Sequence, residues 1–227
     1  MTLLITATEL EGQPLRDSLE NLERLPFPLG QLYTGELAGQ PLHLAHLGVA
    51  KVNTAAGLAL AAHMLQPERV IQFGIGGAYV GSFLSVGMVA VAEREVHLDA
   101  GVVTTEGWSG MEEVGFPLLE EHYNVFPTDE RLTGDLERTT GAVPGTFGTS
   151  ETVTGSFGQA ETLQRRFDLS IESMEGAAAA QVCLALGVPF AELRGVSNIV
   201  GERDKRAWNV PLAVRAVTEA LLNFLRS

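Results

Sequence analysis

The chain has 227 residues, of which 45% are hydrophobic and 19% are charged, and we expect residues 1–227 to form one domain around a buried sheet. It carries 15 Lys and Arg residues against 28 Asp and Glu residues, a formal charge of -13, with no run of basic residues. Binding to a phosphate backbone needs basic clusters, so we expect no nucleic-acid partner.

Cysteine and histidine usage narrows the class of protein further. The sole cysteine, Cys183, excludes an internal disulfide and favours a cytoplasmic location. The apolar start, residues 1–7, lacks the basic region of a signal peptide, and no apolar stretch reaches the ~20 residues that cross a bilayer, so we expect no membrane partner. The histidines form no ligand pair, since His43 and His46 would point to opposite faces of a strand, and we expect no metal and no cofactor.

The first half of the chain alternates short apolar runs with a helical pattern, which is typical of α/β proteins. In chain order the patterns predict a buried strand at 3–6, a hairpin of strands at 31–37 and 42–47, a helix at 52–65, and strands at 69–73 and 86–95. The helix is rich in small residues, and Pro67 ends it. The run Gly74-Ile75-Gly76-Gly77 follows the strand at 69–73 as a glycine-rich turn.

The second half begins with the least regular part of the chain, residues 99–131. A loop of this length is often a lid or a binding loop, and an ordinary surface excursion is an equal alternative. The later patterns predict a strand at 169–173, a helix at 177–184, a strand at 189–196 and an amphipathic helix at 211–225. Together they predict a mixed, largely parallel sheet covered by helices.

Two signals in the first half of the chain follow predicted strands. Glu11 comes just after the strand at 3–6, where it is either a site carboxylate or the last member of a capping box that starts at Thr8. The glycine run lets the backbone approach a ligand closely, and its amides could help hold an anion. It fails as a dinucleotide fingerprint, because Tyr79 stands where the third glycine is needed.

Two polar residues follow the later strands. Glu175 comes just after the strand at 169–173, and Asn198 comes just after the strand at 189–196. Taken singly, Glu175 could be a first-turn acid that complements a helix dipole, and Asn198 could be a turn residue. Strand ends from the beginning, the middle and the last third of the chain nevertheless each deliver a polar residue. We therefore expect a substrate pocket at this edge of the sheet.

Six motifs, which span nearly the whole chain, together resemble the superfamily of nucleoside phosphorylases and nucleosidases. They are Ala7-Thr8-Glu9-Leu10-Glu11, Leu32-Tyr33-Thr34-Gly35-Glu36-Leu37, Gly48-Val49-Ala50-Lys51-Val52-Asn53, Gly74-Ile75-Gly76-Gly77, Ser173-Met174-Glu175-Gly176 and Arg194-Gly195-Val196-Ser197-Asn198. The set is most similar to the methylthioadenosine nucleosidase branch and, within it, to the futalosine hydrolases. The resemblance implies a three-layer α/β/α sandwich with a central mixed sheet that can close into a distorted barrel, assembled as a homodimer or larger homo-oligomer.

The resemblance also implies roles for individual residues. Glu11 takes the place of the acid that activates water, and Glu175 takes the place of the acid that binds the ribose hydroxyls, with Met174 packed beneath the sugar. Thr152 and Val153 fall where the backbone of the family reads the edge of the base. The other substrate-binding residues that it implies are Ile75, Gly76, Ser173 and Arg194. Ile75 replaces a serine of these nucleosidases, which argues against a hydroxyl contact at that spot.

Asn198 is the third implied catalytic residue and a departure from the adenosine-type nucleosidases, which have an aspartate that holds or protonates purine N7. In the related phosphorylases Asn is associated with 6-oxopurines. A neutral amide can donate toward O6 or N7 of hypoxanthine, whereas an unprotonated carboxylate would face the O6 acceptor unfavourably. The departure therefore favours hypoxanthine as the leaving base.

The acceptor is predicted to be water. Phosphorylases of this superfamily hold phosphate with arginines, and Gln72 occupies one of the places where such an arginine stands. Arg16 and Arg24 remain in the N-terminal region, so phosphorolysis stays open as an alternative.

The predicted function is hydrolysis of the N-glycosidic bond of futalosine, which yields hypoxanthine and dehypoxanthine futalosine in menaquinone biosynthesis. The alternatives are a methylthioadenosine or adenosylhomocysteine nucleosidase, a purine nucleoside phosphorylase and a non-catalytic nucleoside-binding domain. The aromatic candidates for binding the 5′ substituent are Trp108, Phe116 and Tyr123. The cationic candidates, which could equally form a solvated turn, are Arg203, Lys205 and Arg206.

Overall fold

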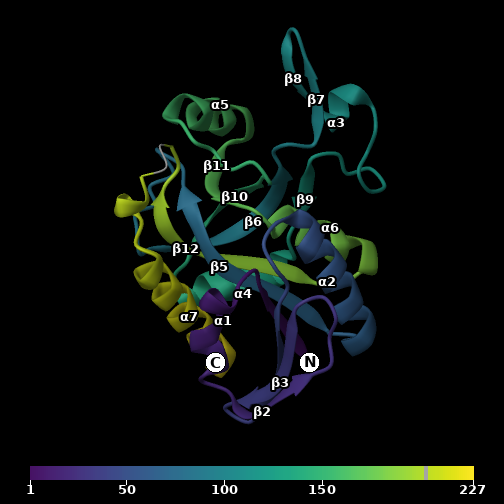
Figure 1. The fold of residues 1–227 in the computed structure, drawn as a ribbon, viewed down its shortest axis with the longest axis vertical. Helices are drawn as coiled ribbons and strands as arrows, with labels where there is room; N and C mark the ends of the chain where they lie inside the picture. Colours follow the sequence, from purple (N-terminus) through teal and green to yellow (C-terminus); the bar gives the residue numbers. More distant parts are fainter. Residues whose placement is uncertain (202–203) are drawn as a thin grey trace.

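The computed structural model describes residues 1–201 and 204–227 (Figure 1). Its strands are β1 (Thr2–Thr6), β2 (Glu20–Leu25), β3 (Gln31–Leu37), β4 (Gln40–His46), β5 (Arg69–Ala78), β6 (Val89–His97), β7 (Gly101–Thr104), β8 (Gly107–Gly110), β9 (Val125–Pro127), β10 (Val143–Thr149), β11 (Leu169–Ser173) and β12 (Phe190–Ile199). Its helices are α1 (Glu9–Arg16), α2 (Lys51–Leu65), α3 (Met111–Val114), α4 (Glu130–Thr140), α5 (Phe157–Phe167), α6 (Gly176–Leu186) and α7 (Val210–Arg226), with a 3-10 turn at Lys205–Ala207.

One ten-stranded mixed sheet organises the molecule. Its strands follow the order β11-β10-β6-β12-β5-β1-β4-β3-β2, and β9 pairs with β6. The central strands β1, β5 and β12 are parallel to one another, so their carboxyl ends meet at the same edge of the sheet. The hairpin of β3 and β4 is antiparallel, as the sequence predicts.

The sheet closes on itself at one end. β11 pairs in parallel with β10 and also runs antiparallel to the end of β5, where Ile171 pairs with Ala78 and Glu172 pairs with Gly77. The strands β11, β10, β6, β12 and β5 therefore form a distorted barrel. This closure brings the end of β11 next to the carboxyl ends of β5 and β12.

Helices cover both faces of the sheet (Figure 1). In β1, Leu3 and Ile5 pack into the core beneath α2 and α6, whereas Leu4 packs into the core beneath α1, α4 and α7. All five residues of β1 are buried, as expected for a strand that is covered on both sides. The three-layer α/β/α architecture is confirmed. None of the helices in the described parts of the chain is long and apolar enough to span a membrane.

The glycine run lies inside a strand, so the predicted turn at 74–77 is wrong. β5 continues through Ala78 because β12 and β11 pair with its last residues. Side chains of other elements occupy the space beside these glycines. A Cβ at Gly74 would lie 2.5 Å from Glu11 Oε1, and one at Gly76 would lie 2.7 Å from Ile171 Cγ2. The glycines therefore admit the Glu11 carboxyl to the sheet instead of turning the chain.

The irregular stretch 99–131 contains more regular structure than its sequence indicates. β7 and β8 form a short ribbon that projects from one end of the molecule beside α3, and β9 joins the main sheet at β6 (Figure 1). The stretch ends in the first turn of α4. These elements are short, and their pairing partners lie elsewhere in the chain, which hides them from a local pattern.

Candidate active site

A cavity of about 420 Å³ opens at the carboxyl ends of β1, β5 and β12, beside the end of β11. Open α/β sheets bind their ligands at this edge. Its lining residues come from the strand ends and the loops that follow them: Ala7, Thr8, Leu10, Glu11, Val49, Ile75, Gly76, Gly77, Val153, Thr154, Glu172, Ser173, Met174, Glu175, Arg194, Ser197, Asn198, Val200, Gly201 and Trp208.

The Glu11 carboxyl lines this cavity and is held on both oxygens. Oε2 accepts hydrogen bonds from the Thr8 amide at 3.0 Å and the Thr8 hydroxyl at 2.7 Å, and Oε1 accepts from the Ile75 amide at 3.0 Å. The Glu11 amide donates back to the Thr8 hydroxyl oxygen at 3.3 Å, which completes a capping box. The capping box is therefore present, and the same residue also lines the cavity, so its role as a site carboxylate stays a prediction.

Glu175 precedes α6 as its N-cap but makes no capping hydrogen bond. Its Oε1 accepts from the Ala50 amide at 3.1 Å, and its Oε2 accepts from Arg194 Nη2 at 3.1 Å. Ala50 has a φ of 78°, a backbone region that costs a non-glycine residue on the order of 1–3 kcal/mol. The strained backbone at Ala50 thus donates its N–H to Glu175. The Glu175 carboxylate lines the cavity and does not cap the helix.

Arg194 connects the two carboxylates. Its side chain is 2% exposed, and it donates from Nη1 to the Ile75 carbonyl oxygen at 3.0 Å and from Nε to Glu192 Oε1 at 2.5 Å. Nη1 lies 3.9 Å from Glu11 Oε1. Burial opposes the charge on Arg194, but the carboxylates of Glu192, Glu175 and Glu11 outweigh it and raise its pKa. A permanent buried cation therefore holds Glu175 by a hydrogen bond and lies beside Glu11.

A second pair of acids lies behind Arg194. Glu95 and Glu192 are fully buried neighbours, and Glu95 Oε1 and Glu192 Oε2 have no other hydrogen-bond partner. Burial and the neighbouring Glu192 carboxylate raise the pKa of Glu95 well above its usual range. Burial also raises the pKa of Glu192, against the attraction of Arg194. Glu95 is therefore the member of the pair that retains a proton, and the Glu192 carboxylate accepts from Arg194.

The part of the cavity beside Gly77, three residues along β5 from Gly74, carries neutral groups and one further acid. Asn198 Oδ1 accepts from the Ser197 hydroxyl at 2.7 Å, and its Nδ2 donates to the Ile199 carbonyl oxygen at 3.1 Å, which leaves one amide hydrogen free. Glu172 lines the same end of the cavity beside Thr154. The sequence analysis does not identify Glu172 or Trp208, because neither lies in one of the six motifs.

The structure brings nearly all the predicted site residues together. The catalytic candidates Glu11, Glu175 and Asn198 share one cavity with the predicted binding residues Ile75, Gly76, Val153, Ser173, Met174 and Arg194. Thr152 is the exception. Its amide and its carbonyl oxygen both bond to the Ser150 hydroxyl, and it does not line the cavity.

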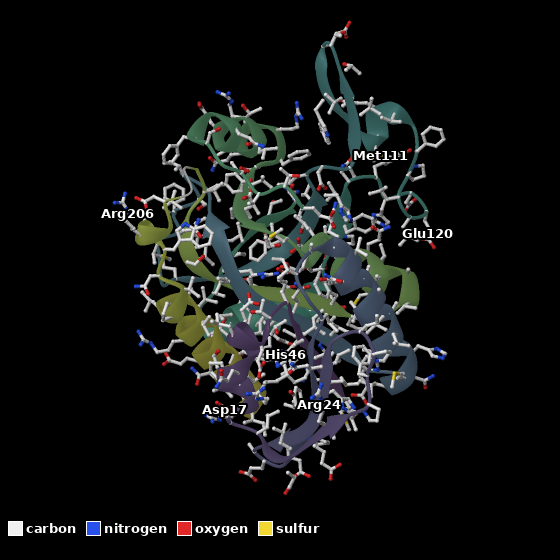
Figure 2. The ribbon with its side chains drawn as sticks, in the orientation of Figure 1. Asp17, Arg24, His46, Met111, Glu120 and Arg206 are labelled. Atoms are coloured by element: carbon white, nitrogen blue, oxygen red, sulfur yellow. The ribbon has the colours of Figure 1, made fainter. Side chains whose placement is uncertain are left out.

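The candidates for the 5′ substituent lie elsewhere. Trp108 and Tyr123 line a different cavity, and Phe116 is 68% exposed. Arg203 and the side chain of Lys205 lie outside the described part of the molecule. Arg206 is exposed at the outer edge of the molecule, where it pairs with Asp204 (Figure 2).

Three further expectations concern groups outside the cavity. Burial raises the pKa of the Cys183 thiol to about 12, so it remains a thiol and no nucleophile. Arg16, a candidate phosphate ligand, pairs with Glu9 at 2.6 Å, and neither Arg16 nor Arg24 lines the cavity. Within residues 1–201 and 204–227, no group of three or more acidic, histidine or cysteine side chains could hold a metal ion.

Comparison with known proteins places the chain in a family. The family model of the Phosphorylase superfamily matches residues 2–226. The chain belongs to this superfamily. A futalosine hydrolase of Thermus thermophilus is 36% identical over 99% of this chain and 95% of the relative. A 5′-methylthioadenosine/S-adenosylhomocysteine nucleosidase of Lysinibacillus sphaericus is 28% identical over 99% of this chain and 98% of the relative.

Solved structures agree on the fold. The 5′-methylthioadenosine/S-adenosylhomocysteine nucleosidase from Neisseria meningitidis, in complex with methylthio-immucillin-A, matches with a TM-score of 0.87 and 25% identity. The match covers 99% of this chain and 98% of the Neisseria chain. The protein is a purine nucleosidase, a hydrolase of N-glycosyl bonds, in the branch that contains both groups of relatives.

Proposed function

We propose that the protein hydrolyses the N-glycosidic bond of a 5′-modified 6-oxopurine nucleoside, namely futalosine, and releases hypoxanthine and dehypoxanthine futalosine in menaquinone biosynthesis. One observation carries the proposal. A single cavity is lined by the buried carboxylates of Glu11 and Glu175 and by Asn198, which keeps one free amide hydrogen; Glu11 lies beside Gly74 of β5 and Asn198 beside Gly77. The similarity to futalosine hydrolases over 99% of the chain supports it.

The two carboxylates suit the sugar. Cleavage of an N-glycosidic bond develops positive charge on the ring through an oxocarbenium-like transition state. Glu11 is the general base that deprotonates the attacking water, and Glu175 binds the ribose hydroxyls and favours the positive ring. Both positions are fixed in advance, Glu11 by backbone amides and Glu175 by Arg194. Such preorganisation avoids the cost of reorienting charged groups during the reaction.

The amide suits the departing base. Asn198 offers one N–H that can donate to O6 or N7 of hypoxanthine and so stabilise the charge that moves onto the base. An amide has no proton of ordinary acidity to transfer. The base therefore leaves as an anion held by hydrogen bonds or takes its proton from water.

Water is the acceptor that fits the charges of the cavity. Among the described residues, Arg194 is the only basic side chain that lines it, and three carboxylates already surround this arginine. A phosphate placed there would face Glu11 and Glu175 without a free cation, an arrangement that Coulomb repulsion disfavours. The geometry therefore favours hydrolysis over phosphorolysis.

Product analysis tests the proposal directly. The purified protein is incubated without phosphate with either futalosine or methylthioadenosine, and the released base is separated and quantified. We expect hypoxanthine from futalosine, with kcat/KM at least tenfold above that for adenine release. A preference for methylthioadenosine would assign the second activity of the branch. A sugar 1-phosphate formed on phosphate addition would identify a phosphorylase, and binding without base release would identify a nucleoside-binding domain.

A further inference from the structure

Asn198 and Glu172 line the cavity from neighbouring strands, in register with the same residue of β5. Asn198 pairs with Gly77 across β12 and β5, and Gly77 pairs with Glu172 across β5 and β11. Residues in register on adjacent strands point to the same face, so the amide and the carboxyl stand on either side of a glycine, roughly 9–10 Å apart at the backbone. A Cβ at Gly77 would lie 2.9 Å from Val200 Cγ2 and 3.1 Å from Asn198 Nδ2, so these side chains pack over the glycine. Glu172, Gly77, Asn198 and Val200 all line the same cavity.

The Glu172 carboxylate has an acceptor position to spare. Its Oε2 accepts from the Tyr79 hydroxyl at 2.9 Å and from the Thr154 hydroxyl, and its Oε1 accepts from the Thr154 amide at 2.9 Å. A carboxylate offers about four lone-pair sites, so one remains on Oε1. Burial and the charge of Glu172 raise the pKa of Tyr79, which keeps its hydroxyl in the donating form.

Glu172 differs from the other site carboxylates in its described partners. Among the described side chains, which leave out those of residues 202, 203 and 205, no basic group forms an ion pair with it, although it is only 8% exposed. Glu175, in contrast, is paired with Arg194. Buried carboxylates are normally compensated by a charge or by a full set of donors. A buried acid that lines a cavity with three neutral donors and one open acceptor position is suited to a ligand that brings a further N–H.

Hypoxanthine and adenine differ in whether N1 donates a hydrogen bond. A 6-oxopurine carries an N1–H donor beside the O6 acceptor, whereas a 6-aminopurine carries an unprotonated N1 acceptor beside an amino group. The free N–H of Asn198 can serve N7, which accepts in both bases, so this amide alone discriminates weakly between them. An ionised carboxylate only accepts, so it binds N1–H and opposes an unprotonated N1.

We propose that Glu172 is the second base-reading residue of this site: its carboxylate accepts the N1–H of the 6-oxopurine and so selects it against a 6-aminopurine, while Asn198 donates to the O6 and N7 side. The inference rests on the proposed function, whose substrate carries hypoxanthine. It assigns to Glu172 the discrimination that the Asn198 amide cannot provide by itself. The bonds to Thr154 hold the carboxylate at the backbone next to Val153, the predicted base-reading segment.

The first test needs no mutation. Dissociation constants of hypoxanthine, 1-methylhypoxanthine and adenine are measured by calorimetry on the wild-type protein. We expect hypoxanthine to bind at least a hundredfold more tightly than 1-methylhypoxanthine, which lacks the N1–H, and at least tenfold more tightly than adenine. Equal affinity for hypoxanthine and its 1-methyl derivative would overturn the inference, and this result does not depend on the folding of any variant.

The second test separates base reading from support of the loop. Glu172→Gln replaces the charged acceptor by a neutral amide, and we expect the ratio of hypoxanthine to adenine affinity to fall about tenfold. Tyr79→Phe is the matched control, because it removes one supporting hydrogen bond and leaves the free acceptor position, so it should weaken both bases alike and keep the ratio. An unchanged ratio in Glu172→Gln would overturn the inference.

These binding measurements also keep the inference apart from the proposed function. A wild-type protein that prefers adenine would refute the hypoxanthine assignment itself. A wild-type protein that prefers hypoxanthine, with a ratio that Glu172→Gln does not change, would refute only the role of Glu172.

Discussion

We call the part of the cavity around Glu11 and Glu175 the sugar end and the part around Asn198 and Glu172 the base end, after the proposed function. The two ends contain different kinds of polar groups. At the sugar end, Glu11, Glu175 and Glu192 surround the buried guanidinium of Arg194, and Glu95 adds a proton to this cluster. At the base end, an amide and hydroxyl groups line the cavity with a single acid, Glu172, which pairs with no basic group among the described side chains. The sugar end is therefore arranged to hold negative charge in fixed positions, which suits a cationic transition state. The base end presents a pattern of donors and acceptors, which suits discrimination between bases.

The largest expected effect is a loss of stability when Arg194, the cation at the centre of the sugar end, is replaced. Arg194→Met leaves Glu11, Glu175 and Glu192 buried without their cation, and removal of one partner of a buried ion pair costs about 3–5 kcal/mol. Urea unfolding should show a loss of stability of this size. The control is Arg165→Met, which removes an exposed pair with Glu161 and should cost about 0.5 kcal/mol or less. Comparable losses in the two variants would show that the cluster is no stronger than a surface pair.

The next effect concerns catalysis at the same end. Glu11→Gln should lower kcat on futalosine by roughly a hundredfold or more, the usual scale for a lost general base. The protein should still fold, because glutamine also completes a capping box, although its NH2 group cannot accept the hydrogen bond from the Ile75 amide. Thr8→Ala is the complementary variant, which keeps the carboxylate and loses the cap at a cost of about 1 kcal/mol. Full activity in Glu11→Gln would reduce Glu11 to its capping role.

A smaller effect tests the base end. Asn198→Asp places a carboxylate against O6 of hypoxanthine, a mismatch on the order of 1–3 kcal/mol, while a protonated carboxyl could donate to N7 of adenine. The ratio of kcat/KM for futalosine to that for its 6-amino analogue should therefore fall about ten- to a hundredfold. A constant ratio would mean that Asn198 does not read the base.

Per pH unit, the smallest effect is a dependence of stability on pH that arises at the sugar end. The pKa of Glu95 is raised in the folded protein, so its contribution is fully present below the unfolded value near 4.5 and is lost as pH rises toward the folded pKa. One such proton changes stability by at most about 1.4 kcal/mol per pH unit. Glu95→Gln mimics the protonated acid and keeps a donor toward Glu192. Thermal unfolding from pH 5 to 8 should show a flatter profile for the variant, and parallel profiles would mean that Glu95 is ionised.

Much of the fold is visible in the sequence because it depends on local pattern. The strand at 169–173 is predicted with its observed ends, and the helices at 52–65 and 211–225 are predicted within two residues of theirs. The glycine run is misread because its meaning is set by Glu11, a residue more than sixty positions away that occupies the space beside Gly74. Arrangement of one domain and assembly into oligomers stay predictions.

The site residues also divide into those that a local pattern predicts and those that depend on distant contacts. Glu11 and Glu175 can be predicted because each follows a strand at the edge where ligands bind, whereas Asn198, predicted just after a strand, is the next-to-last residue of β12 at the same edge. Glu172 and Glu192 lie inside strands, where an acid in an apolar run gives no sign of its partners. Their significance comes from Tyr79, Thr154, Glu95 and Arg194, which other strands and loops supply. A pattern read along one strand cannot show what faces it from the next.

The closure of the sheet also bears on how the protein is made. Glu11 belongs to the start of the chain and Asn198 to its last strand, and β5 must pair with both β12 and β11 before the cavity has walls. Contacts between residues so distant in sequence form late, because the intervening chain must first be ordered. During synthesis, no segment that stops before β12 contains the cavity. The appearance of activity in a translation reaction should therefore coincide with completion of the chain, and partial products should contribute none.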